Sequence, residues 1–348
     1  MPLRPEVARL LHEVYLSKGV HGTAAIEGNT LSEEEVLARV RGQLELPGSQ
    51  SYLTQEIDNI VAACNSILAE MDSGDAMVLT PDRIKWFNRQ VLENLDVGPD
   101  VVPGEVRKHS VGVLTYRGAP AEDCEYLLEE MCHWLGTLRA PDPELRFTYA
   151  MIRAIMAHLY IAWIHPFGDG NGRTARLIEF QLLIQAGVPV PVAHLLSDHY
   201  NRTREQYYRE LAKTSKPPYS CDDFIHYALR GFVDELRLQL GVVREEQMAV
   251  TWENYVHERF RDNDTPSARR QKHVVLDLPD GQPVRRADIP KLSVRVATAY
   301  AGKGSKTVTR DLNTLSAMGL IARDANGVTA RRSVIRAFLP SRADVVGE

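Results

Sequence analysis

Two strongly apolar segments, residues 144–164 and 173–185, flank a short glycine-rich turn in the middle of the chain. Apolar residues recur at helical spacing on most of their faces, which predicts a pair of buried helices. Pro166 ends the first helix, and Gly187 and Pro189 close the second. The sequence therefore predicts a mostly α-helical core with this pair at its centre.

The first hundred residues carry further helical periodicity. Residues 5–16 predict a short amphipathic helix, and a second helical stretch follows Gly22 and ends near Gly28. Thr30-Leu31-Ser32-Glu33 has the pattern of a capping box, which predicts a helix through about Val40. Thr80 followed by Pro81 is typical of a helix N-terminus. We expect other helices over residues 51–71, 80–95, 121–138, 201–213 and 220–261.

Residues 96–118 differ from this helical background. Gly98, Pro99, Pro103 and Gly104 indicate a loop, and Ser110–Tyr116 favours extended structure. The pattern predicts a β-hairpin, which is either a flap over a site or a plain surface hairpin.

Composition limits the class of protein. Of 348 residues, 44% are hydrophobic and 25% are charged, so the chain should form two or three folded domains rather than a disordered or fibrous polymer. No run approaches the roughly 18 to 20 apolar residues of a membrane span, and the N-terminus is charged where a signal peptide is apolar. We expect a cytoplasmic protein without a membrane partner. Four scattered cysteines, Cys64, Cys124, Cys132 and Cys221, lack metal-site spacing and suggest buried thiols.

The C-terminal part has a different character. Residues 261–268 are polar and rich in helix breakers, so a domain boundary is expected near them. Short helices are predicted over 283–289 and 292–300, then a helix from a Ser305 cap to Ile321, stopped by Gly319, and two strands within 328–339. The predicted divisions are an N-terminal helical region (1–95), a core (96–240), a helical linker (241–275) and a small last domain (276–348).

The turn itself, His165-Pro-Phe-Gly-Asp-Gly-Asn-Gly-Arg-Thr-Ala-Arg176, has the residue types of an anion site. Gly168, Gly170 and Gly172 lack Cβ atoms, so their backbone N–H groups can approach an anion closely. The following helix begins at Arg173, and its first N–H groups and dipole favour phosphate.

Four side chains in the turn could act on a bound phosphate. His165 stands at a helix end and could serve as a general base. Arg173 and Arg176 lie three residues apart on one side of the helix and can donate to phosphate oxygens. Asp169 offers a hard oxygen ligand to Mg²⁺. A plain connecting turn needs no such set.

Other nucleotide and hydrolase motifs do not occur. The segment Ala301–Thr307 differs from a P-loop because Gly304 follows Lys303 where a hydroxyl residue is required.

The turn resembles the signature of Fic-domain proteins, His-Pro-Phe-x-Asp-Gly-Asn-Gly-Arg-x-x-Arg, and matches it at every fixed position. The similarity extends over roughly residues 5–235. It implies a Fic-type helical core with a short β-hairpin flap, ATP as the donor, and adenylylation of a Ser, Thr or Tyr hydroxyl on a target protein.

The resemblance also assigns roles to residues. His165 would take the proton from the target hydroxyl, which attacks the α-phosphorus and expels pyrophosphate. Asp169 would hold Mg²⁺ on the phosphates, Arg173 would contact the β-phosphate and Arg176 the γ-phosphate. The ATP-binding residues implied are Gly170, Asn171, Gly172, Arg173, Thr174, Ala175, Arg176 and Tyr208.

Tyr207 and Tyr208 resemble the family segment that flanks adenine, where an aromatic ring could stack on the base. Two tyrosines on a helix are by themselves better explained by ordinary core packing. Where many relatives have Asn just downstream, this chain has Ser215 or Lys216.

Residues Thr23–Asn29 resemble the family's inhibitory pattern, Ser/Thr-x-x-x-Glu-Gly/Asn. Glu27 would pair with Arg176 and place a negative charge where the γ-phosphate should lie. The same carboxylate could instead orient water to remove AMP from a modified protein, and the sequence leaves both directions open.

The last domain resembles winged-helix domains, with Ser305, Lys306, Thr309 and Arg310 at the start of the recognition helix. From residue 266 onward, 15 Lys and Arg stand against 7 Asp and Glu, a net charge of +8 that suits DNA. Use of residues 276–348 for protein contact is the alternative. A DNA-binding regulator with a nucleotide-sensing Fic-like part therefore remains a rival to the enzyme, and autoadenylylation and a homodimer stay open.

Overall fold

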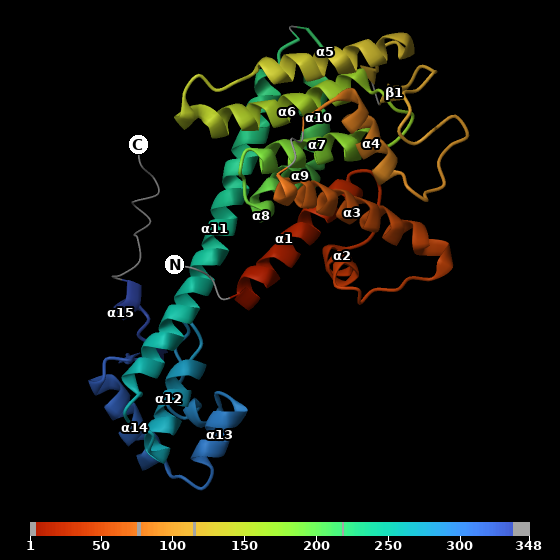
Figure 1. Ribbon diagram of the computed structural model, residues 1–348. Coiled ribbons are helices and arrows are strands. Elements are labelled where there is room, and N and C mark those ends of the chain that lie inside the picture. Colours follow the sequence, from red (N-terminus) through yellow and green to blue (C-terminus); the bar gives the residue numbers. More distant parts are fainter. Residues whose placement is uncertain (1–4, 75–77, 114–115, 218, 337–348) are drawn as a thin grey trace. The chain divides into compact units, whose positions relative to one another are not determined.

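The computed structural model describes residues 5–74, 78–113, 116–217 and 219–336 of the chain. It is mostly helical, as predicted (Figure 1). The described residues up to Leu238 form one compact unit and those from Gln239 onward form a second. Each unit has its own apolar core. The division falls inside one helix, upstream of the polar segment 261–268 where the sequence predicted a boundary.

The first unit is built almost wholly from helices. In chain order its elements are α1 (Pro5–Ala25), α2 (Glu33–Val40), η1 (Gly48–Gln50), α3 (Ser51–Ser73), α4 (Pro81–Val91), β1 (Gly112–Val113), β2 (Tyr116–Arg117), η2 (Ala121–Asp123), α5 (Cys124–Thr137), η3 (Pro143–Leu145), α6 (Arg146–Ile164), α7 (Asn171–Gln185), α8 (Val190–Ala193), α9 (Leu195–Arg202), α10 (Arg204–Thr214) and the first part of α11 (Asp222–Arg259).

The predicted buried pair is the centre of this unit. Helix α6 packs along α7, and α7 also contacts α3, α4, α8 and α1 (Figure 1). Nearly every side chain of α7 is buried, including the polar Thr174, Glu179 and Gln181. The turn that carries the Fic-like residues is therefore held between two packed helices, one of which, α7, contacts helices on several sides.

The N-terminal helix differs from the prediction. The sequence favoured two stretches separated near Gly22, whereas α1 is one helix from Pro5 to Ala25. Gly19 and Gly22 lie inside it because the chain packs closely there. A Cβ on Gly19 would lie 2.3 Å from His194 Nδ1, and one on Gly22 would lie 2.7 Å from the Ser197 carbonyl oxygen. These glycines permit close packing rather than break the helix.

Helix starts follow local capping rules, with one correction. Thr80 caps α4, as predicted, and its Oγ1 accepts from the Arg83 N–H. The capping box of α2 is formed by Ser32 and Glu35, not by Thr30 and Glu33. The third residue after the cap must reach back to it, and in the folded chain that residue is Glu35.

The extended segment is a two-stranded antiparallel hairpin in which Gly112 pairs with Arg117 and Val113 with Tyr116. Leu114 and Thr115, which the prediction included, lie outside the described residues. The short helices α8 and α9 were not predicted, because Pro189, Pro191 and the polar residues after Leu196 obscure their periodicity.

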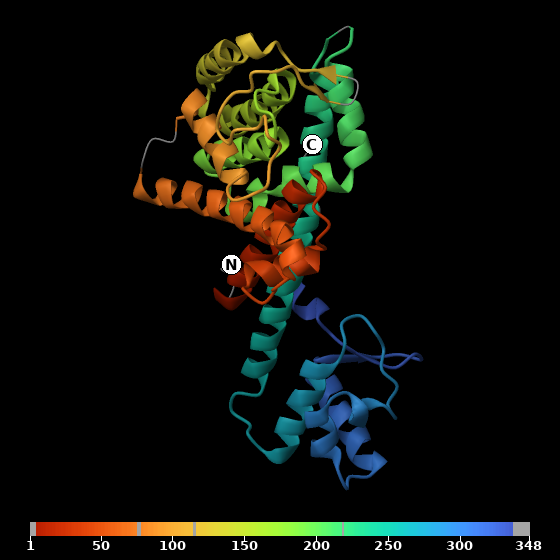
Figure 2. The same cartoon turned by 90° about the vertical axis from the view of Figure 1, so that its right-hand side faces the viewer.

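The second unit contains the rest of α11, α12 (Pro266–Asp277), η4 (Ile289–Lys291), α13 (Val294–Tyr300), α14 (Ser305–Ala317), β3 (Ile321–Arg323), β4 (Val328–Ala330) and α15 (Ser333–Arg336). Figure 2 shows the β3–β4 hairpin at the edge of the three helices α12, α13 and α14. This arrangement places α14 with one face on the core and the other exposed.

Several predictions for this unit were wrong. Residues 283–289 are not a helix; Val284 instead forms a bridge to Val328 beside the hairpin. The N-cap of α14 is Gly304, without a side-chain cap, and Ser305 is its first helical residue. Only one strand lies within 328–336, because β3 precedes it, and residues 337–339 are outside the described part.

One helical stretch, Pro143–Ile164, is long and apolar enough to cross a membrane by length and composition, contrary to the prediction that no run comes close. The most apolar 18-residue window of this stretch is 56% buried inside the first unit. A helix in a protein core has the same length, composition and burial. Cys64 and Cys124 are buried as predicted, whereas Cys132 and Cys221 are only half-buried.

Candidate functional site

The turn between α6 and α7 is held in shape by its own side chains. His165 follows the last residue of α6 with φ 49° and ψ 57°, a left-handed conformation that is rare for residues other than glycine. Asn171 Oδ1 accepts from the Phe167 N–H at 3.0 Å, and Asn171 Nδ2 donates to the Phe167 carbonyl at 2.8 Å. The amide side chain of Asn171 therefore closes the turn.

Asn88, which the sequence did not predict as a site residue, also holds the turn in shape. Asn88 on α4 is fully buried, and its Nδ2 donates to the Asp169 carbonyl at 2.8 Å. Its Oδ1 accepts from the Gly104 N–H at 2.9 Å. Thr174, predicted to bind ATP, is also fully buried and lies 3.4 Å from Asn88 Nδ2 through its hydroxyl. Thr174 therefore supports the turn rather than faces the pocket.

The N-terminus of α7 is already covered by a carboxylate. Gly170 precedes the helix with φ 77°, and no side chain caps it. A Cβ on Gly172 would lie 2.1 Å from Glu27 Oε1. Glu27 thus rests directly on the first turn of α7, where the unpaired N–H groups and the helix dipole favour an anion.

Arg176 is the principal partner of this carboxylate. Its Nη2 donates to Glu27 Oε1 at 2.6 Å and to the Thr23 carbonyl at 2.9 Å. Only 1% of the Arg176 side chain is exposed. Burial opposes the charge of Glu27, but Arg176, Arg173 and His165 together hold the pKa of Glu27 below its usual value. The pair predicted from sequence is therefore formed and ionised.

Arg173 is directed to other acids. Its Nη1 donates to Glu56 Oε1 at 2.9 Å, and its Nη2 donates to Asp169 Oδ1 at 3.2 Å. Glu56 lies on α3, in a part of the chain for which the sequence suggested no functional role. Glu56 and Arg173 lie 117 positions apart along the chain, so no local sequence pattern could indicate their contact.

Asp169 is the most open residue of the set, with 48% of its side chain exposed. Its Oδ1 accepts from the Gly170 N–H at 2.5 Å. Among the described residues, no three His, Cys, Asp or Glu side chains are arranged around a common metal position. The donor set therefore fits a Mg²⁺ ion only if phosphate oxygens and water complete the shell, which is the usual manner of binding for this ion.

The imidazole of His165 is partly buried at the edge of the site. Burial and the positive charge of Arg107 lower the pKa of His165 to about 4, while Glu27 and Asp169 act in the opposite direction. The ring is therefore neutral at physiological pH. A neutral imidazole can accept a proton, as a general base must.

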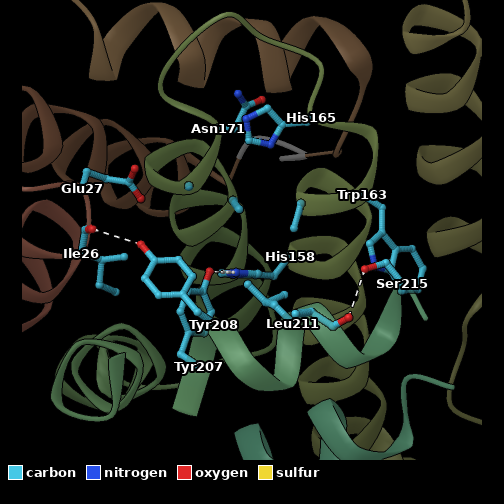
Figure 3. A pocket seen from close by; sticks show the side chains of 14 residues that line it. Ile26, Glu27, His158, Trp163, His165, Asn171, Tyr207, Tyr208, Leu211 and Ser215 are labelled. Carbon is cyan, nitrogen blue, oxygen red and sulfur yellow. Dashed lines mark hydrogen bonds between the residues drawn. The ribbon is translucent and has the colours of Figure 1, made fainter. Parts of the chain in front are cut away.

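His165, Asn171 and Glu27 line a cavity of about 160 Å³, whereas Arg173, Arg176 and Asp169 are not among its lining residues. Figure 3 shows His165 and Asn171 on one side of it, Glu27 at one end, and Tyr207 and Tyr208 on the opposite side. Other lining residues are Ile26, His158, Ala162, Trp163, Gly172, Ala175, Leu211, Ala212 and Ser215. A mostly apolar wall with a polar end suits a flat base attached to an anionic group.

The two tyrosines have different positions. Tyr208 is half-buried and donates to the Ile26 carbonyl at 3.3 Å (Figure 3). Tyr207 is buried, and its hydroxyl lies 2.8 Å from His158 Nε2. His158 Nδ1 in turn lies 3.1 Å from Glu179 Oε2. Tyr208 therefore offers the freer ring to a ligand, and Tyr207 belongs to a buried polar network that sequence analysis missed. Ser215 lines the cavity, whereas Lys216 does not.

Comparison with known proteins relates this chain to one family. Residues 78–183 match the model of the Fic/DOC family. A protein adenylyltransferase fic-1 of Caenorhabditis briggsae is 31% identical over 219 residues, which cover 60% of this chain and 40% of that protein. The chain thus spans less than half the length of this curated relative.

Solved structures agree on the fold. The structure of a Fic family protein from Desulfovibrio desulfuricans aligns over 90% of this chain and 83% of its own chain. The TM-score is 0.57 and the sequence identity is 20%. Fic-1 of Caenorhabditis elegans covers 70% of this chain and is covered to 65%, with a TM-score of 0.53 and 26% identity.

Proposed function

Because the chain carries a domain of the Fic/DOC family, we propose that it is an enzyme that transfers AMP from ATP to a hydroxyl of a target protein. The observation that supports this most is that a neutral imidazole and a helix N-terminus line one cavity, together with a carboxylate, Glu27, that is paired with the buried guanidinium of Arg176. A protein that only senses a nucleotide needs no general base such as His165.

In the proposed reaction each group has one task. The backbone N–H groups at the start of α7 and the side chains of Arg173 and Arg176 bind the phosphates. A Ser, Thr or Tyr hydroxyl of the target gives its proton to His165, and its oxygen forms a bond to the α-phosphorus. The bond from that phosphorus to the bridging oxygen breaks, and pyrophosphate leaves. Asp169 would hold Mg²⁺, which neutralises phosphate charge when bound.

We further propose that Glu27 inhibits the transfer. Its carboxylate lies on the anion site and occupies Arg176 Nη2, so ATP cannot place a phosphate there until Glu27 moves. A water-activating role in the removal of AMP is the alternative.

Transfer of labelled AMP from ATP tests this proposal. We expect Glu27→Gly to raise self-labelling or labelling of proteins in a cell extract at least several-fold. Glu27→Gly combined with His165→Ala should abolish labelling. Glu33→Gly, a change of an exposed acid that pairs only weakly with Lys18 at 3.6 Å, is the matched control and should leave the rate unchanged. Labelling that survives without His165 would refute the mechanism. Release of AMP from a labelled target by the wild-type chain would favour the removal reaction.

A specific surface favours DNA binding as a second function. Lys306, Arg310 and Asn313 lie at helical intervals on the exposed face of α14, opposite the buried Val308 and Leu312. Within the described part of the chain, neither Lys306 nor Arg310 has an acidic partner. Two arginines flank this face: Arg286 Nη1 lies 3.4 Å from the Thr309 hydroxyl, and Arg323 Nη1 donates to Asn313 Oδ1 at 2.9 Å.

A salt titration with duplex DNA tests this second function. Lys306→Glu with Arg310→Glu should weaken binding and reduce its salt dependence, because two phosphate contacts are lost. Lys291→Glu, which alters an exposed lysine paired with Asp288, is the control and should change little. Binding that is equal in all three proteins would remove α14 as the DNA surface.

A further inference from the structure

Arg107 is a buried arginine that sequence analysis left without a role. It lies in the loop before β1, and only 4% of the residue is exposed. Its guanidinium donates to four backbone carbonyls: Nε to His165 at 2.7 Å, Nη1 to His109 at 2.6 Å, and Nη2 to Ala119 at 2.5 Å and to Ile164 at 3.3 Å. None of these partners is a carboxylate, so among the described residues the cation is held by backbone carbonyl dipoles.

Two of the carbonyls belong to the end of α6. The last carbonyls of a helix have no partner within it, and a cation near them also interacts favourably with the helix dipole. Here the helix ends in His165, whose left-handed backbone is costly without outside contacts. The Arg107 N–H also donates to the Pro166 carbonyl at 2.9 Å. Arg107 thus holds the backbone on both sides of the base.

The other two carbonyls belong to the hairpin. His109 precedes β1 and Ala119 follows β2, so one guanidinium joins both ends of the hairpin. Gly118 fits between the two groups: a Cβ there would lie 3.1 Å from Arg107 Nη2 and 3.1 Å from His165 Cβ. The hairpin and the base are therefore fixed to each other through Arg107.

We propose that Arg107 is a positioning residue of the transfer reaction, which fixes the His165 imidazole and holds the β1–β2 hairpin in a constant place beside it. This inference rests on the proposed function. Arg107 does not line the nucleotide cavity, so its effect acts on the base and the hairpin and not on ATP.

The charge of Arg107 supplies a second, independent readout. The charged groups that act on His165 are Arg107, Glu27 and Asp169. Burial is the largest cause of the low pKa of His165, and Arg107 is the next. Loss of this charge should therefore raise the pKa of His165, and Arg107→Lys, which keeps the charge, separates this effect from a change in burial.

The experiment compares Arg107→Gln and Arg107→Lys in the full chain. An NMR titration of the His165 ring, assigned with His165→Asn, should give a pKa that is about one unit higher in Arg107→Gln and nearly unchanged in Arg107→Lys. In the Glu27→Gly background both variants should lose kcat, on the order of 10²-fold for a base misplaced by about an ångström. The KM for ATP should change less than about twofold, since uniform ATP binding is untouched.

Arg39→Gln is the matched control, because Arg39 is a half-buried arginine that donates to Asp58 and to the Leu44 carbonyl elsewhere in the unit. It should change neither the His165 titration nor kcat. Unchanged titration and kcat in Arg107→Gln, or a loss confined to the KM for ATP, would overturn the proposal. If no variant transfers AMP, the proposed function fails, and the ring titration still decides whether Arg107 acts on His165.

Discussion

Asp198 on α9 is a carboxylate in surroundings that disfavour its charge. Only 9% of the residue is exposed. Burial and the charge of Glu235 raise the pKa of Asp198 to about 6. The charges of Arg202, whose Nη1 lies 4.0 Å from Asp198 Oδ2, and of Lys18 offset this only in part. Its place in the fold is structural: its backbone N–H group lies close to Gly22 of α1. Stability of the α1–α9 contact should therefore depend on pH.

We predict that Asp198→Asn stabilises the protein near neutral pH. Between the ordinary pKa of 3.8 and about 6 the folded state binds more protons than the unfolded state, so the free energy of unfolding falls as pH rises through this window. Asparagine carries no charge to bury, so Asp198→Asn does not lose this part of the free energy of unfolding as pH rises. The melting temperature of Asp198→Asn should exceed that of the wild type at about pH 7.5, and the difference should shrink towards about pH 4.

Because the wild type and Asp198→Asn share all other titratable groups, the effect of those groups on stability cancels in the difference between the two melting temperatures. His165, His194 and His199 have pKa values lowered chiefly by burial, so both proteins lose stability together in acid. A difference in melting temperature that stays constant across the pH range would contradict the assignment to Asp198.

At the scale of elements, α1 carries Glu27 to the site by its packing on α9. The packing depends on Gly22, where a Cβ would lie 2.7 Å from the Ser197 carbonyl oxygen and 3.2 Å from the Asp198 nitrogen. These are backbone atoms inside a helix and cannot give way cheaply. Any added volume must therefore move α1, and Glu27 with it.

We predict that Gly22→Ala both destabilises the protein and increases AMP transfer. Overpacking should lower the free energy of unfolding by about 1 to 3 kcal/mol, and displacement of Glu27 should release Arg176. The measurements are urea unfolding and labelled AMP transfer.

Gly136→Ala is the control for this prediction. Gly136 lies in α5, and apart from its chain neighbours and the backbone of its own helix, no heavy atom of the described residues lies within 4 Å of a Cβ built there. The substitution should stabilise the helix by up to about 1 kcal/mol and leave transfer unchanged. A destabilised Gly22→Ala protein with the wild-type rate would separate the packing of α1 from the control of the site.

The difference between local spacing and long-range packing explains which site residues could be predicted from the sequence. His165, Asp169 and Arg176 lie within twelve consecutive residues, so spacing alone brought them together. Asn88 and Arg107 act through contacts with residues 58 to 81 positions away. Such contacts depend on how α4 and the loop before β1 pack against the turn, and no local pattern records that.

Element boundaries show the same limit. Gly22 suggested a break in α1 because glycine weakens an isolated helix, yet close packing on α9 requires it. Residues 283–289 had helical composition, but Val284 is paired with Val328 of the hairpin. In both cases a tertiary contact outweighed a weak local preference.

The whole molecule contains two separate apolar cores, one in each unit. The second core has a polar centre: Asp311 is fully buried and accepts from Arg270 Nε at 2.6 Å, from Gln271 Nε2 at 3.0 Å and from the Tyr300 hydroxyl at 3.0 Å. Arg270 and Asp311 each hold the pKa of the other in the charged range. Loss of one partner would leave a charge buried without compensation.

We predict that Asp311→Ala lowers the stability of the second unit alone. Scanning calorimetry of the full chain should resolve two transitions, and the substitution should destabilise one of them by about 3 to 5 kcal/mol. Asp288→Ala, which removes an exposed acid, should shift neither. Parallel shifts of both transitions would mean that the two cores unfold as one cooperative block.

Glu27 and Arg176 lie 149 positions apart along a single polypeptide, so their pairing is an intramolecular event. The contact needs no second molecule, so its formation within one chain does not itself require a high protein concentration. If Glu27 inhibits transfer as proposed, the inhibition is therefore built into each chain. In that proposal, any ligand or modification that moves the first helix or the turn after it would release Arg176.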